Sequence, residues 1–207
     1  MINKISFLNG SLGLVKQITE RAIKGKIDFH ESLTQRVATL KGVLLSDLER
    51  LILNMPYTHG VERLVRILKM LGYRIGIVSG GFSLVIDHIR NRFDLDYGFA
   101  NTLDIWHGQL TGRILGDIID GPIKARLLRE VSRSEKILPQ QVIAVGDGAN
   151  DLEMLSEAGL RIAFNVNRFL RERASGSLSL PNLDALIYFL GISRSEVEAL
   201  DLHVHPV

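Results

Sequence analysis

An acidic turn carries the side chains in this sequence that are best suited to chemistry. Asp147, Asn150 and Asp151 follow the apolar run at residues 142–145, whose β-branched side chains predict a buried strand. The glycines on either side of Asp147 allow a sharp bend. Helical spacing of leucines begins directly afterwards. The pattern therefore predicts oxygen ligands at the carboxyl end of a parallel strand, where open α/β sheets bind ligands.

Three interpretations of this turn are open. A dinucleotide-binding loop would need glycine where Asp151 stands, and Asp147 would repel a pyrophosphate, so this interpretation is disfavoured. Carboxylates at a strand end suit Mg²⁺, which in turn recruits phosphate. Alternatively, Asn150 or Asp151 only caps the following helix while Asp147 is solvated.

A second segment with chemical potential is the serine and glycine pair at residues 79–81. Ser79 offers a hydroxyl, and Gly80 and Gly81 offer unobstructed backbone N–H groups before a predicted helix, whose N-terminus favours anions. The segment could cradle an oxyanion. The alternative is that Ser79 caps the helix and the glycines form a tight turn.

Lys124 stands in the first turn of a predicted helix at residues 122–131. This end of a helix is unfavourable for a cation unless an anion or carboxylate lies nearby. The alternative is a solvated surface lysine.

The histidines are scattered, and His203 and His205 on the terminal tail are expected at the surface, because no second cluster supplies further metal ligands. The sequence contains neither a P-loop nor a Gly-x-Ser-x-Gly elbow.

Composition limits the class of protein. The 207 residues are 46% apolar, and 25 basic against 23 acidic residues give a net charge of +2, which does not indicate nucleic-acid binding. Cysteine is absent, which excludes disulfides and thiolate metal sites and is compatible with a reducing cytoplasm. No apolar run approaches the roughly 18 residues of a membrane span, and no signal segment begins the chain. We expect a soluble, cytoplasmic protein that does not bind membranes.

The elements that must position these residues fall into three segments. Residues 1–55 show helical periodicity without a strand-like run, and Pro56 marks a boundary. Residues 56–191 alternate between helix and strand, which predicts an α/β domain with a doubly wound parallel sheet. Residues 192–207 are expected to form a short helix and a polar tail. The helices expected in the middle segment are at residues 61–71, 82–93, 122–131, 151–158, 168–174 and 183–190, and the strands at 73–78, 142–145 and 160–164, with short β-like runs within 96–105 and 109–119.

Taken together, these motifs resemble a known superfamily. Residues 79–82, Lys124 and residues 146–154 are similar to motifs two, three and four of the haloacid dehalogenase superfamily. Residues 18–37 resemble the helical cap of its phosphoserine phosphatases, and the similarity extends from near residue 2 to about residue 190. The resemblance implies a Rossmann-like core with a small helical cap at 1–55, and hydrolysis of L-phosphoserine to L-serine and phosphate in serine biosynthesis.

The resemblance also implies roles for the residues around the phosphate. Ser79, Lys124 and Asp151 would be catalytic. Ser79 would bond the phosphoryl oxygens, with Gly80 and Gly81 contributing to substrate binding, and Lys124 would neutralise their charge. Asp151 would order the metal-bound waters and the loop.

Metal and substrate contacts are implied in the same way. Asp147 would ligate Mg²⁺, and Asn150 would help to order the site and bind substrate. In the cap, Arg36 would bind the substrate carboxylate, for which a bidentate guanidinium is suited. Phe29 and Ile23 would form an apolar wall over the substrate, with Ile23 standing where the family usually has methionine.

One family motif is absent from these residues. The superfamily's first motif, Asp-x-Asp-x-Thr, carries the nucleophilic aspartate and the general acid and base, and no segment of this sequence matches it. We therefore expect that the first core strand is missing, that the 207-residue chain is inactive, and that it is unstable, aggregates or is completed by another segment. The alternative is a non-catalytic protein that folds and binds phosphate or a partner chain. Asn167 and Arg168 also replace the family's Lys-Pro.

Overall fold

The computed structural model describes residues 1–165, 172–179 and 181–202. The chain divides into two compact units, each built from two segments. Unit 1 contains Met1–Met55 and Ile77–Asp120, and unit 2 contains Pro56–Gly76 and Gly121–Val207. The chain passes between the units next to Pro56, where the sequence predicts a boundary. The division into segments 1–55, 56–191 and 192–207 stays a prediction.

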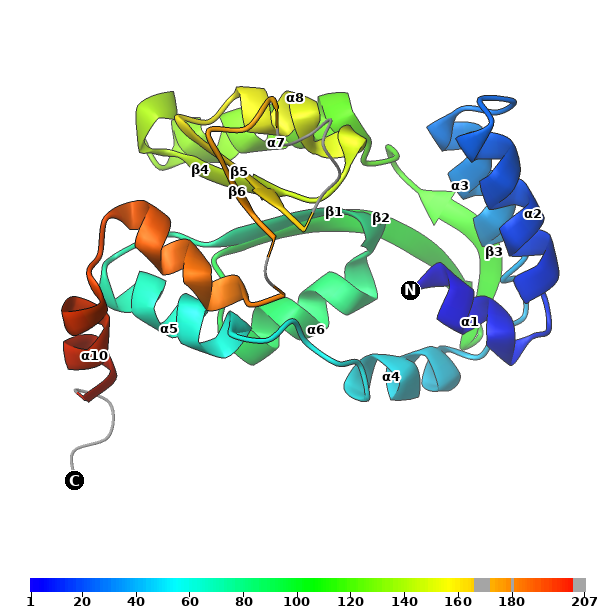
Figure 1. Cartoon of the computed structure of the whole chain (residues 1–207). Coiled ribbons are helices and arrows are strands. Elements are labelled where there is room, and N and C mark those ends of the chain that lie inside the picture. Colours follow the sequence, from blue (N-terminus) through cyan, green and yellow to red (C-terminus); the bar gives the residue numbers. More distant parts are fainter. Residues whose placement is uncertain (166–171, 180, 203–207) are drawn as a thin grey trace. The chain divides into compact units, whose positions relative to one another are not determined.

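The first segment of unit 1 is helical, as expected from its periodicity (Figure 1). Its helices are α1 (Ile2–Leu8), α2 (Leu12–Ile23), α3 (Phe29–Ala38) and α4 (Leu45–Leu53). Asp28 fixes the start of α3, because its carboxylate accepts a hydrogen bond from the backbone N–H of Glu31 at 2.7 Å. Apolar residues spaced three and four apart, such as Leu33, Val37 and Leu40, point into the core of this unit.

The second segment of unit 1 supplies a three-stranded sheet of order β1-β2-β3. Its elements are β1 (Gly76–Phe82), α6 (Ser83–Phe93), β2 (Tyr97–Trp106) and β3 (Gln109–Leu115). Strands β2 and β3 form an antiparallel hairpin in which Trp106 faces Gln109. His107 and Gly108 between them both have positive φ, at 48° and 74°, as a two-residue type I′ turn requires.

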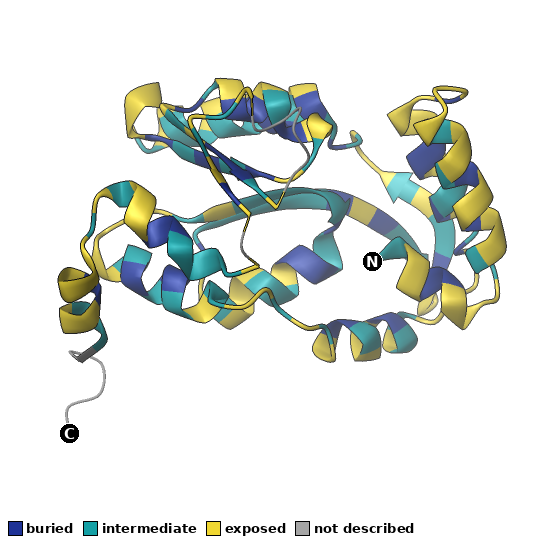
Figure 2. Cartoon of the chain, in the orientation of Figure 1, coloured by how far each residue is buried: buried dark blue, intermediate teal, exposed yellow. Residues whose placement is uncertain are grey.

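Unit 2 contains a parallel sheet of order β4-β5-β6 with helices packed beside it. Its elements are α5 (Val61–Met70), α7 (Gly121–Ser134), η1 (Pro139–Gln141), β4 (Ile143–Gly146), η2 (Ala149–Asp151), α8 (Leu152–Ser156), β5 (Leu160–Phe164), β6 (Gly176–Leu178), η3 (Leu183–Leu190) and α10 (Arg194–Leu202). The parallel register pairs Ile143 with Leu160 and Ile162 with Gly176. Buried side chains of α5, β5 and η3 form one core of this unit. The buried residues of the chain are dark blue in Figure 2.

Three features of the fold differ from the expected elements. The described strands form two three-stranded sheets, one with an antiparallel hairpin, within the α/β class that the sequence predicts. Strand β1 continues through Phe82, so residues 79–82 end a strand and do not begin the helix. The helix expected at 168–174 does not include residues 172–174, which form a turn and a bend before β6. The rest of that helix, as well as Asn167, His203 and His205, lies outside the described residues. No helix in the described ranges is long and apolar enough to cross a membrane.

Candidate active site

A buried ion pair links the first turn of α7 to the acidic turn after β4. The Lys124 Nζ donates to Asp151 Oδ1 at 2.6 Å, and both side chains are 6% exposed. The sequence predicts that a lysine at this end of a helix needs an anionic neighbour, and Asp151 is that neighbour. The alternative of a solvated surface lysine is therefore wrong.

The second oxygen of Asp151 organises the backbone of the turn. Asp151 Oδ2 accepts hydrogen bonds from the N–H groups of Asp147, at 3.0 Å, and Gly148, at 3.1 Å. Asp151 precedes α8, but its side chain makes no capping bond to that helix. The helix-cap interpretation of Asp151 is therefore wrong, since the carboxylate bonds to Lys124 and to the preceding loop.

A side chain at either glycine of the turn would meet a close neighbour. A Cβ at position 146 would lie 2.6 Å from the Cβ of Asp151. A Cβ at position 148 would lie 2.6 Å from Oδ1 of Asn150. Neither glycine has a positive φ. The glycine pattern therefore allows Asp151 and Asn150 to fold back over the turn.

Asp147 is the residue of this turn that is available to a cation. Its side chain is exposed, as is that of Asn150, while its backbone N–H is held by Asp151. Mg²⁺ is usually held by one or two carboxylates together with water and phosphate oxygens, and an exposed carboxylate beside a fixed loop fits that donor set. Among the described residues, no group of three or more His, Cys, Asp or Glu side chains is arranged to hold a metal. Asp147 thus fits as a single protein ligand.

In unit 1, Ser79 lies half-buried near the end of β1. Its Oγ accepts a hydrogen bond from the Gly81 N–H at 3.0 Å. Helix α6 begins only at Ser83, after an N-cap at Phe82, so Ser79 does not cap it. Both helix-based interpretations of Ser79 need this correction, because the strand stays extended through the two glycines. The hydroxyl oxygen instead accepts a hydrogen bond from the backbone of the same strand.

Asn101 was not among the predicted site residues, although it fixes the backbone around Ser79. Asn101 is only 1% exposed, and its Nδ2 donates to the carbonyls of Gly80, at 3.0 Å, and Gly81, at 3.2 Å. Its Oδ1 accepts from the Ile119 N–H at 2.8 Å. The β-like run at residues 96–105 also contains Asp96, Thr102 and Asp104, so the polar side chain of Asn101 gave no distinct signal. A buried amide with partners on both sides holds these strands in one arrangement.

Arg36 occupies the last turn of α3. The guanidinium is half-buried, and its Nε donates to the Ser32 carbonyl at 3.2 Å. Burial lowers the pKa of Arg36 from its ordinary value, with no compensating ion pair to a carboxylate in the described part of the chain. A partly desolvated cation of this kind is suited to bind an anion from outside the protein.

The other two predicted cap residues differ in their surroundings. Phe29 is the first residue of α3, and the tip of its ring approaches the end of β1. A Cβ built at Gly80 would lie 3.3 Å from Phe29 Cζ. Ile23 is the last residue of α2 and is 80% exposed. The structure therefore brings Phe29 to the serine and glycine segment, while the place of Ile23 in the same wall stays a prediction.

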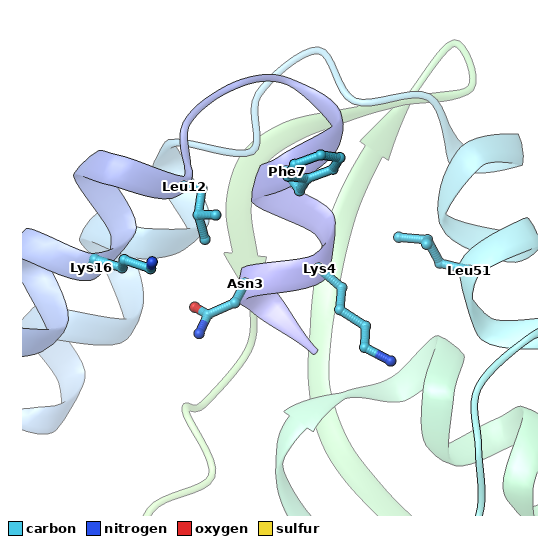
Figure 3. Close-up of a pocket in the computed structure, with 6 residues that line it drawn as sticks. All are labelled: Asn3, Lys4, Phe7, Leu12, Lys16 and Leu51. Carbon is cyan, nitrogen blue, oxygen red and sulfur yellow. The ribbon is translucent and has the colours of Figure 1, made fainter.

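A groove on unit 1 lies apart from the predicted site residues. It has a volume of about 420 Å³ and is lined by residues of α1, α2 and α4, namely Asn3, Lys4, Phe7, Leu12, Lys16 and Leu51 (Figure 3). None of these is a residue expected to act on phosphate. The groove is therefore not part of the candidate site.

Comparisons with known proteins agree with these motifs. A sequence profile of haloacid dehalogenase-like hydrolases matches residues 2–159. The chain is 46% identical to a phosphoserine phosphatase of Streptomyces coelicolor, covering 90% of this chain and 46% of that protein. It is 42% identical to a phosphoserine phosphatase of Idiomarina loihiensis, covering 88% of this chain and 83% of that protein.

The fold is similar to that of solved structures as well. A crystal structure of a probable phosphoserine phosphatase from Vibrio cholerae superimposes with a TM-score of 0.87 and 32% identity, over 98% of this chain and 61% of that one. The chain spans about half the length of the first three curated relatives that it matches.

Proposed function

The chain belongs to the haloacid dehalogenase-like hydrolases and to their phosphoserine phosphatases, and on this premise we propose that it binds L-phosphoserine for hydrolysis to L-serine and phosphate. The observation that carries the proposal is the buried Lys124–Asp151 pair beside the exposed carboxylate of Asp147. A fixed ammonium and a carboxylate suited to a hard cation are two groups that phosphoryl transfer requires.

Ser79 and Lys124 bind the phosphoryl group in this proposal. The Ser79 oxygen already accepts the Gly81 N–H, so its own proton is left to donate to a phosphoryl oxygen. The Gly80 and Gly81 backbone, braced by Asn101, keeps that hydroxyl in place. Lys124 neutralises phosphoryl charge, and Asp151 is the positioning residue that holds the ammonium.

Asp147 would hold Mg²⁺, with Asn150 ordering the loop beside it. When bound, the ion supplies charge neutralisation at the phosphoryl oxygens. The contribution of the chain is the arrangement of the loop, in which Asp151 ties down the backbone N–H of Asp147 and leaves the Asp147 carboxylate exposed.

Cap residues recognise the remainder of the substrate. Arg36 binds the substrate carboxylate, because its partly buried guanidinium donates to the Ser32 carbonyl and forms no ion pair with a carboxylate in the described residues. Phe29 covers the serine and glycine segment and excludes water from it, and Ile23 extends this apolar wall. Exclusion of water strengthens hydrogen bonds to the phosphoryl group.

The covalent step requires a nucleophile, which the family supplies as the aspartate of its first motif. The sequence has no Asp-x-Asp-x-Thr motif. We accordingly expect the 207-residue chain to bind L-phosphoserine without releasing phosphate from it.

Calorimetric titration of the purified chain with L-phosphoserine in the presence of Mg²⁺, followed by a phosphate assay, tests the proposal. Ser79→Ala should weaken binding about 10-fold, because it removes a hydrogen bond to a charged group. Ser132→Ala, on the distant part of α7, is the control and should bind as the unaltered chain does. Absence of binding would contradict the proposed substrate, and phosphate release that Lys124→Ala abolishes would contradict the expected inactivity.

A further inference from the structure

A hydrogen-bonded histidine and aspartate in unit 1 lie next to the predicted substrate wall, and the proposed function gives them no role. The His30 Nε2 donates to Asp120 Oδ2 at 2.8 Å, since a carboxylate can only accept. The His30 side chain is 51% exposed and that of Asp120 is 23% exposed. His30 belongs to the first turn of α3, and Asp120 ends the segment after β3. The pair therefore joins two parts of the chain that are 90 residues apart.

The sequence neighbours of this pair converge on Gly80. Phe29, which precedes His30, places its Cζ 3.3 Å from the position of a Cβ at residue 80. Ile119, which precedes Asp120, places its carbonyl oxygen 3.5 Å from that position. The Phe29 and His30 rings meet edge to face, with their centroids 6.3 Å apart. The end of β1 is thus enclosed by the residues that the His30–Asp120 pair holds.

Asn101 completes the support on the side of Ile119. It bonds the Ile119 N–H and the carbonyls of Gly80 and Gly81, so the segment that ends at Asp120 is fixed relative to β1. Asp120, which follows Ile119, is therefore held at a fixed position relative to Gly80, and His30 bonds to it. By contrast, the Asp28 cap at the start of α3 acts within the helix and cannot orient it towards β1.

We propose that the His30–Asp120 pair is a positioning device that holds the Phe29 ring over Gly80 and so sets the affinity of the site for its phosphorylated substrate. His30 and Asp120 are positioning residues, because they act through Phe29. The part of the inference that concerns substrate rests on the proposed function. The part that concerns Phe29 and Gly80 is a property of the folded chain by itself.

The competing interpretation is an exposed polar contact without consequence, since even exposed salt bridges often contribute little to stability. The two interpretations differ in what replacement by glutamine does. In His30→Gln, the side-chain amide keeps a donor that can reach the Asp120 carboxylate, whereas His30→Ala removes it. A positioning role predicts that His30→Gln restores the arrangement that His30→Ala loses.

Nuclear magnetic resonance of the ligand-free chain tests the geometric part. A ring lying over Gly80 shifts the resonances of its Hα protons, and Phe29→Ala shows where they fall without the ring. In His30→Ala they should move towards their positions in Phe29→Ala, and in His30→Gln they should stay at the positions of the unaltered chain. His59→Ala, at an exposed histidine of unit 2, is the control and should leave them unchanged. Unmoved Gly80 resonances in His30→Ala, or no restoration in His30→Gln, would overturn the proposal.

Calorimetric titration with L-phosphoserine and Mg²⁺ tests the functional part. His30→Ala should raise the dissociation constant about 5- to 10-fold, the size expected for loss of one orienting hydrogen bond, and His30→Gln should remain within about twofold. Equal affinities in all three proteins would overturn the role in binding. If the unaltered chain bound no L-phosphoserine, the proposed function would fail, while the Gly80 resonances would still decide whether the pair positions Phe29.

Discussion

Lys124 Nζ and Asp151 Oδ1 lie 2.6 Å apart, and each side chain is only 6% exposed. The contact joins the first turn of α7 to the loop after β4, whose backbone the other carboxylate oxygen holds. One buried carboxylate thus fixes both the ammonium that would meet a phosphoryl group and the loop that presents Asp147. Loss of this pair would therefore affect both the position of the Lys124 ammonium and the loop that presents Asp147.

Removing the lysine should destabilise the fold of unit 2. Lys124→Ala leaves the Asp151 carboxylate buried without its cation, and breaking a buried pair costs about 3–5 kcal/mol. Urea unfolding followed by circular dichroism measures the loss. Lys16→Ala, at an exposed lysine of α2, is the control and should change the free energy of unfolding by less than about 0.5 kcal/mol. A loss below about 1 kcal/mol in Lys124→Ala would contradict the buried pair.

The two glycines of the turn should differ in their tolerance of alanine. Gly146→Ala would place its Cβ 2.6 Å from the Cβ of Asp151, which is held by Lys124 and cannot move without breaking the pair. We expect a loss of about 1–3 kcal/mol. Gly148→Ala meets only the end of the exposed Asn150 side chain, which can rotate away, so its loss should be under about 1 kcal/mol. Equal losses in urea unfolding would contradict this explanation.

Asn101→Ala should be among the more harmful changes in unit 1. It removes an amide that makes three hydrogen bonds, two to the partly buried carbonyls of Gly80 and Gly81 and one to the buried N–H of Ile119. The expected loss is about 2–4 kcal/mol, measured by urea unfolding. Asn54→Ala, at an exposed asparagine with one hydrogen bond to Arg50, serves as the control and should lose under about 1 kcal/mol. Similar losses at the two positions would argue against the bracing role.

The stability of unit 2 should decrease in acid because of Asp201 in the last helix, α10. A hydrogen bond from Arg63, with a further one from Arg66, lowers the pKa of Asp201 from its usual range. A lowered pKa in the folded state means that the ionised carboxylate stabilises the fold above its unfolded pKa of about 3.9, and that this stability is lost as pH falls through the folded value.

Asp201→Asn cannot lose this contribution, so its free energy of unfolding should fall less than that of the unaltered chain between about pH 6 and pH 2. Urea unfolding at a series of pH values measures the difference. Asp94→Asn is the comparison variant. It replaces a carboxylate of unit 1, at the residue after α6 whose backbone is in the left-handed region. Parallel curves for Asp201→Asn and the unaltered chain would contradict the assignment.

Local patterns in the sequence were enough to predict much of this fold. Periodicity located the helices of residues 1–55, and the apolar run before Asp147 located β4 to within one residue. The glycine and aspartate spacing identified the acidic turn, because the close approach of Asp151 to Gly146 is a local contact between residues five positions apart or fewer. Strand β5 was predicted with its bounds unchanged.

Contacts between distant segments could not be predicted in the same way. Asn101 holds β1 extended through Gly80 and Gly81, so the predicted turn at Ser79 became the end of a strand. The three residues of β6 pair with β5 across 14 positions, and so short a segment carries little periodicity of its own. Likewise, the sequence indicated that Lys124 needs an anion, and only the structure identified it as Asp151.

The central claim is that the chain is built to bind a phosphate ester that also carries a carboxylate, and Arg36 gives it the most direct test. The measurement is the ratio of dissociation constants for O-phosphoethanolamine and L-phosphoserine, which differ by that carboxylate, determined calorimetrically with Mg²⁺ for the unaltered chain and for Arg36→Gln. We predict that the unaltered chain prefers L-phosphoserine by about 10- to 100-fold, as a charge-assisted contact implies, and that Arg36→Gln removes most of this preference. Equal affinities for the two ligands in the unaltered chain, or a preference that Arg36→Gln leaves intact, would contradict the account.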